Sequence, residues 1–127
     1  MIPARVLADA LEAAGIGVVG KTIFIGRIPA EKMTIEGLWS VAAVSPPFST
    51  THWKTTMQMQ ISVLFSSEDV DKMYELDPVI RRALMKIPLE NEFIPRVTVA
   101  PLQDNDLIEG ELRAGVWMVE VVVINSK

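Results

Sequence analysis

The sequence predicts an α+β fold, in which an N-terminal helix and a central helix pack on one face of a mainly antiparallel sheet of about five strands. Residues 55–66 alternate between apolar and polar side chains, which is typical of an antiparallel strand packed on one side. Residues 3–14 and 68–87 carry apolar side chains at three- and four-residue steps, which indicates amphipathic helices. Apolar runs at 22–28, 38–45, 94–102 and 115–125 supply the other strands.

The length of 127 residues indicates a single domain, residues 1–127. Half of the residues are apolar, and 12 basic against 16 acidic residues give a net charge of −4. The absence of cysteine excludes disulfides, thiolate metal sites and cysteine nucleophiles. The mild acidity disfavours non-specific nucleic-acid binding. The longest apolar stretch, Val116–Ile124, contains Glu120 and is far shorter than the ~20 residues of a membrane-spanning helix.

The first helix is expected over residues 3–14, because Pro3 suits a first turn and Gly15 and Gly17 suit a helix end. Two short strands follow, at Thr22–Ile28 and Leu38–Ser45. The segment after them, Ser45–Thr56, is polar apart from two aromatic residues. It is either a long hairpin loop or an extended arm.

The central helix is expected to begin after a cap at Ser66 or Ser67. Pro78 interrupts its apolar stripe, so the sequence allows either a kink or two abutting helices there. Pro88 is expected to end the helix. One stripe holds the apolar residues, namely Val70, Met73, Leu76, Ile80, Leu84 and Ile87.

The strand over Ile94–Leu102 carries prolines, which indicates an edge position. A turn is expected at Asp104–Asp106 and a charged excursion at residues 107–114. The last strand, Gly115–Asn125, is apolar on both faces. Two helices can cover one face of such a sheet. The other face, together with Trp39, is then exposed unless a second chain covers it, which favours association. The alternative is a sheet that curls and buries both faces within one chain.

No motif for enzymatic chemistry stands out, and neither a metal nor a cofactor is expected. His52 is the only histidine, and no G-x-S-x-G elbow accompanies it. The acids at residues 68–71 suit the start of a helix, and those from Asp104 onward lack the glycine and glutamate spacing of a calcium loop. The glycines at 15–20 follow a helix instead of a strand, so they do not form a dinucleotide fingerprint.

Contact surface is the remaining functional signal. Phe48 and Trp53 flank a polar segment, where aromatic residues either anchor an interface or fold back onto their own core. The sequence alone leaves both readings open. The residues expected to contribute to an interface are Trp39, Phe48, His52, Trp53, Trp117, Met118, Val122 and Ile124.

The order of helix, two short strands, long glutamine-bearing strand, helix and two C-terminal strands resembles the tail terminator proteins of long-tailed (siphovirus-like) bacteriophages. The resemblance rests on three segments: Ile23-Phe24-Ile25-Gly26-Arg27-Ile28-Pro29 after the first helix; Thr56-Met57-Gln58-Met59-Gln60-Ile61-Ser62-Val63 before the helix that starts at Glu68; and Gly115-Val116-Trp117-Met118-Val119-Glu120-Val121. Together they span most of the chain.

The resemblance implies a non-enzymatic virion subunit, assembled in the host cytoplasm, that forms a homo-oligomeric, hexameric ring at the head–tail junction. Such a ring caps the tail tube protein, ends tail polymerisation and presents a surface to the head connector or head-closure protein. DNA would be its passing cargo only, and no membrane is involved. The alternatives are another connector component, such as a head-closure or tail-completion protein, and a small carboxylate-based enzyme or ligand-binding α+β domain.

Overall fold

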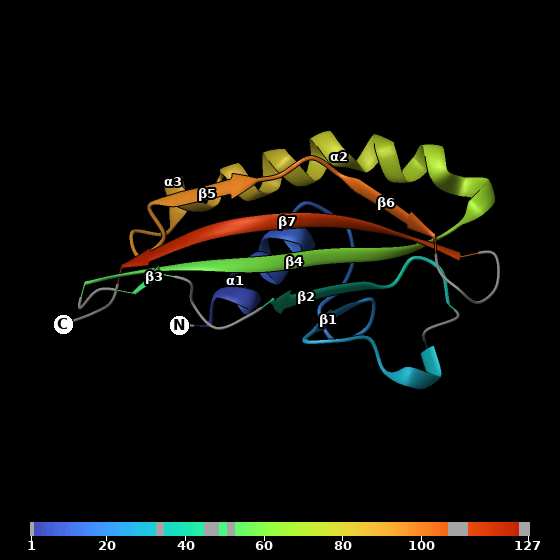
Figure 1. The fold of residues 1–127 in the computed structure, drawn as a ribbon, viewed down its shortest axis with the longest axis horizontal. Helices are drawn as coiled ribbons and strands as arrows, with labels where there is room; N and C mark the ends of the chain where they lie inside the picture. Colours follow the sequence, from blue (N-terminus) through green and yellow to red (C-terminus); the bar gives the residue numbers. More distant parts are fainter. Residues whose placement is uncertain (1, 33–34, 45–48, 51–52, 107–111, 125–127) are drawn as a thin grey trace.

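The computed structural model describes residues 2–32, 35–44, 49–50, 53–106 and 112–124. Figure 1 shows the chain as a long sheet with helices behind it. The helices are α1 (Pro3–Ala13), η1 (Ala30–Lys32), η2 (Ser67–Asp69), α2 (Val70–Met85) and α3 (Ile87–Glu90). The strands are β1 (Ile23–Ile25), β2 (Trp39–Ala43), β3 (Ser49–Thr50), β4 (Lys54–Ser66), β5 (Arg96–Val99), β6 (Gln103–Asp106) and β7 (Leu112–Ile124).

The predicted α+β class and mainly antiparallel sheet are confirmed. The strand order is β1-β2-β4-β7-β5, with β3 beside β4 and β6 beside β7. All pairs are antiparallel except β1 with β2, which run parallel. The predicted edge position of the strand between the prolines is confirmed, since β5 pairs with β7 alone.

Strands β4 and β7 form the centre of the sheet. They pair continuously from Lys54 with Ile124 to Ser66 with Leu112, without a bulge. The period of two along β4 therefore turns one complete row of side chains, Met57 through Phe65, toward the core. The long alternating pattern in the sequence thus specified the longest strand pair.

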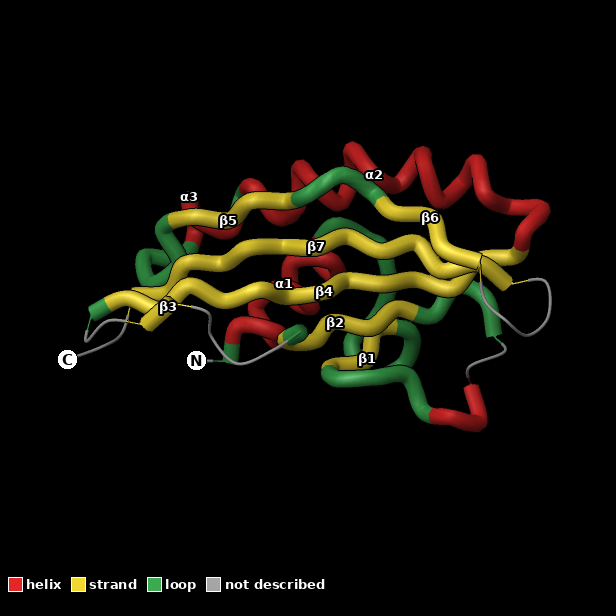
Figure 2. The backbone as a smooth tube through the Cα atoms, viewed as in Figure 1, coloured by secondary structure: helices red, strands yellow, loops and turns green. Residues whose placement is uncertain are grey.

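Both main helices cover the same face of the sheet (Figure 2). Leu7 and Leu11 of α1 and Ile80 and Leu84 of α2 are fully buried against it. Where the helices meet the sheet, the rings of Trp39 and Trp117 stack with centroids 5.8 Å apart. Neither α1 nor α2 covers the opposite face (Figure 1).

The central helix differs in detail from its prediction. Pro78 lies inside a continuous α2, and the interruption falls at Lys86, between α2 and α3. Pro88 lies in the first turn of α3, where a missing N–H costs nothing, so it helps to begin this short helix instead of ending the long one. Ser66 caps η2, accepting a hydrogen bond from the Glu68 N–H at 3.3 Å.

The expected turn at Asp104–Asp106 is wrong, because these residues belong to β6 and pair with β7. Asp104 accepts a hydrogen bond from Arg113 Nε at 2.8 Å, so an ion pair joins the two strands. Residues 112–114, assigned to a charged excursion, are the first residues of β7. The remainder of that excursion, residues 107–111, lies outside the described part of the chain.

Candidate interaction surfaces

Trp39 and Trp117, which the sequence suggested for an interface, are core residues, and that prediction is wrong. Their side chains are 3% and 0% exposed on the helix-covered face. A buried indole needs a partner for its N–H, and Trp117 Nε1 finds one in Asp77 Oδ1 of α2, at 2.8 Å. Neither residue therefore offers surface to another chain.

Asp77 is the centre of a half-buried network that joins α2 to the sheet. Its carboxylate accepts from Arg81 Nε at 3.0 and 3.1 Å. The other guanidinium nitrogens of Arg81 donate to the carbonyls of Val99 and Ala100, at 2.9 and 2.8 Å. This arrangement satisfies the indole, the carboxylate and two carbonyls at the end of β5, so its role is to hold α2 in place.

The helix-free face of the sheet is less apolar than the sequence indicated. Val116 and Val122 are buried, although α1 and α2 lie on the other face of the sheet. Thr56 and Arg96 lie opposite Val122 on the two neighbouring strands, and cross-strand neighbours on one face of a sheet are close enough to shelter a small side chain. Met118 is partly exposed. The continuous exposed apolar face that the sequence predicted is therefore absent from this part of β7.

Four of the eleven exposed large apolar side chains of the described residues lie at one end of the molecule. Trp53, Leu89, Phe93 and Ile124 are 51, 85, 44 and 36% exposed. The Ile124 N–H donates to the Phe93 carbonyl at 2.8 Å, Lys54 pairs with Ile124, and the Lys54 ammonium lies 5.4 Å from the Trp53 ring centre. The end of the sheet nearest β3 and α3 in Figure 1 therefore carries a mixed aromatic and aliphatic surface, which we term the apolar end.

The apolar end contains two of the residues that the sequence singled out, Trp53 and Ile124. Two others, Phe48 and His52, lie outside the described residues. Sequence reasoning missed Leu89 and Phe93. Both follow the last apolar position of the central helix, so the helical pattern does not bury them. A large apolar residue just outside an amphipathic pattern has no predicted place in the core, and this signal could have identified them.

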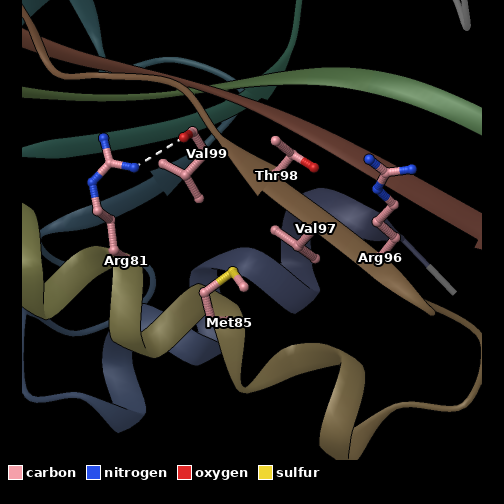
Figure 3. A pocket seen from close by; sticks show the side chains of 6 residues that line it. All are labelled: Arg81, Met85, Arg96, Val97, Thr98 and Val99. Atoms are coloured by element: carbon pink, nitrogen blue, oxygen red, sulfur yellow. Dashed lines mark hydrogen bonds between the residues drawn. The ribbon is translucent and has the colours of Figure 1, made fainter.

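A groove of about 440 Å³ lies between α2 and β5. In Figure 3, Met85 reaches up from α2 toward Val97, with Arg81 near one end and Arg96 near the other. The outer edge of β5 faces this groove, and there Arg81 donates a hydrogen bond to the Val99 carbonyl. The groove combines an apolar floor with the Arg96 side chain at one end, whereas Arg81 at the other end is ion-paired with Asp77.

In the described residues, no three His, Cys, Asp or Glu side chains are placed to hold a metal ion. None of the helices described here has the length and hydropathy to cross a membrane. Comparison with protein-family models and with curated proteins gave no match.

Proposed function

We propose that this chain is a structural subunit of a phage virion, located at the head–tail junction, that forms a ring capping the tail tube, ends tail polymerisation and provides the surface for head joining. The apolar end is the observation that carries the proposal. Large apolar side chains that gather on a surface mark a site of association. Aromatic anchors such as Trp53 contribute most of the energy of an interface.

The position of the apolar end suits assembly with neighbours. Trp53 directly precedes β4 and Ile124 ends β7, so the longest and best-paired strands of the sheet hold both residues. A contact made there would be supported by a rigid element, which limits the entropy lost on binding. Subunits joined through two different surfaces close into a ring when the rotation between them permits it.

The experiment combines the protein with the tail tube protein of the same phage. Native mass spectrometry and negative-stain imaging should show rings at tube ends and tubes that stop growing. Trp53→Ala should weaken this capping while the circular dichroism spectrum stays unchanged. The matched control is Ile35→Ala, which removes a similarly exposed apolar side chain from the segment after η1.

Two results would argue against the proposal. One is a wild-type protein that leaves tube growth unchanged and binds no tube protein. The other is equal loss of capping in the Trp53 and Ile35 variants, because the apolar end would then have no special role. Binding to the portal or its adaptor, without binding to the tube, would identify a head-closure protein instead.

A further inference from the structure

The outer surface of α2 carries opposite charges toward its two ends. Asp71 and Glu75 are exposed in its first half, Arg82 is exposed in its last turn, and Lys86 is exposed directly after it. At 3.6 residues per turn, these four positions fall within roughly 60° of one another around the helix axis. They form one line along the side of α2 that faces away from the core, which we term the charge stripe.

The charge stripe is not explained by contacts within its own chain. Lys72 contacts Asp69 at 3.5 Å and Arg81 contacts Asp77 at 3.0 Å, so other charges in this region are paired. Among the described residues, no salt bridge includes a member of the charge stripe.

The spacing within the charge stripe also disfavours an isolated helix. Each end places two like charges four residues apart, and such pairs destabilise a helix. The order of signs suits the helix dipole, but the dipole acts within the first and last turns. Glu75, the sixth residue of α2, lies beyond that range.

We propose that α2 pairs antiparallel with α2 of a second copy of this chain, around a two-fold axis near Pro78 and Val79. The spacing is self-complementary, because the pairs 71/86 and 75/82 share one midpoint along the helix, at position 78.5. Asp71 of each copy then faces Lys86 of the other, and Glu75 faces Arg82. Every member of the charge stripe meets an opposite charge.

Tyr74 and Met85 supply an apolar contact beside the charge stripe. Their side chains are 49 and 56% exposed, and both lie on the same flank of the stripe. A two-fold antiparallel pair brings the same flanks together. The midpoint, (74 + 85)/2 = 79.5, lies one residue from that of the charges. In the proposed pair, the Tyr74 ring of one copy lies beside the Met85 side chain of the other, a favourable aromatic–thioether contact. The Tyr74 hydroxyl keeps its hydrogen bond to Asp104 of its own chain, at 3.4 Å.

The inference goes beyond the proposed ring and does not depend on it. A two-fold contact uses the same surface on both copies and closes with two, whereas a ring needs two different surfaces. The apolar end is not part of the α2 contact. Failure of tail capping would leave the α2 pair intact, and loss of the α2 pair would leave capping to be tested separately.

The test measures dimerisation by sedimentation and native mass spectrometry over a wide concentration range. The acid-reversed variant Asp71→Lys/Glu75→Lys and the base-reversed variant Arg82→Glu/Lys86→Glu should each raise the dimer dissociation constant by about tenfold or more, since like charges then face each other. An equimolar mixture should recover a dimer that contains one of each, because one stripe is now entirely basic and the other entirely acidic.

The matched control is Glu90→Lys/Glu92→Lys, which changes the net charge as much as the acid-reversed variant does, at exposed positions outside the charge stripe. It should dimerise like the wild type. A second variant, Tyr74→Ala/Met85→Ala, leaves every charge in place and should also weaken the dimer. Circular dichroism checks that each variant is folded.

A wild-type protein that stays monomeric at all concentrations would overturn the inference. So would a mixture of reversed variants that forms no mixed dimer, or a control that loses dimerisation to the same extent. Association that both reversed variants leave unchanged would also contradict it, because the contact would then not involve the charge stripe.

Discussion

Gly115 of β7 leaves open the space that the Met73 side chain of α2 occupies. A Cβ at residue 115 would lie 2.9 Å from Met73 Cγ and would also meet the Met73 sulfur and Val63 Cγ1. The fully buried thioether therefore reaches the sheet only because β7 has no side chain there. This contact sets how closely the first half of α2 approaches the centre of the sheet.

Gly115→Ala should destabilise the protein by about 1–3 kcal/mol, because it overpacks this contact. Met73 is buried and has little room to move away. The measurement is the free energy of unfolding in urea. In the double variant Gly115→Ala/Met73→Ala, the loss of unfolding free energy should be smaller than the sum of the two single losses. A loss equal to or larger than that sum would show that the two residues do not compete for one space.

Trp117→Phe should cost about 1–3 kcal/mol, because it leaves the Asp77 carboxylate without its indole donor in a half-buried site. Asp77→Ala should cost a comparable amount, since it also releases the Arg81 side chain. The two changes act on one network, so the double variant should be less destabilised than the sum of the single ones. Additive free energies of unfolding would show that the indole and the carboxylate are independent.

Trp53→Ala should change the free energy of unfolding by less than about 0.5 kcal/mol, because half of the side chain is exposed at a strand end. Trp39→Ala should cost about 3–5 kcal/mol, since it removes a large buried ring from the core. Thermal or urea unfolding of both variants checks this contrast. A large loss in the Trp53 variant would assign that residue to the core and weaken the proposed function.

Arg113→Met should loosen β6 without unfolding the sheet. The change keeps the aliphatic stem and removes the ion pair to Asp104, which is worth about 1 kcal/mol or less at this partly exposed site. Hydrogen exchange should become faster at the amides of Gln103–Asp106, while those of β4 stay protected. Unchanged exchange in β6 would show that backbone pairing alone holds this strand.

The sequence could predict the elements that depend on periodicity. The alternation over 55–66 predicted β4 nearly to the residue, and the prolines around residues 96–99 predicted an edge strand. The face of β7 that the helices cover was harder to predict, because β7 is apolar on both sides and its pattern does not distinguish them. Trp117 lies in the core because β7 pairs it with Ile61 of β4 and because Asp77, forty residues away in the chain, accepts from its indole.

The candidate surface was less predictable than the fold. Trp53 and Ile124 stand out as apolar residues in a polar segment and at a strand end. Their proximity to Phe93 follows from the hydrogen bond that joins the end of β7 to the segment before β5. The pattern of charges on α2 is visible in the sequence, but its significance depends on which charges find partners within the chain.

The continuous pairing of β4 with β7 has a consequence for synthesis. The partners are separated by 112 − 66 = 46 residues at one end and by 124 − 54 = 70 at the other. As the chain leaves the ribosome, the edge of β4 that pairs with β7 has no strand neighbour until residues 112–124 are translated. Contacts between such distant parts of a chain form slowly. This edge of β4 therefore stays open while residues 67–111 are made, and the alternating glutamines of β4 keep one face of the strand hydrated during that interval.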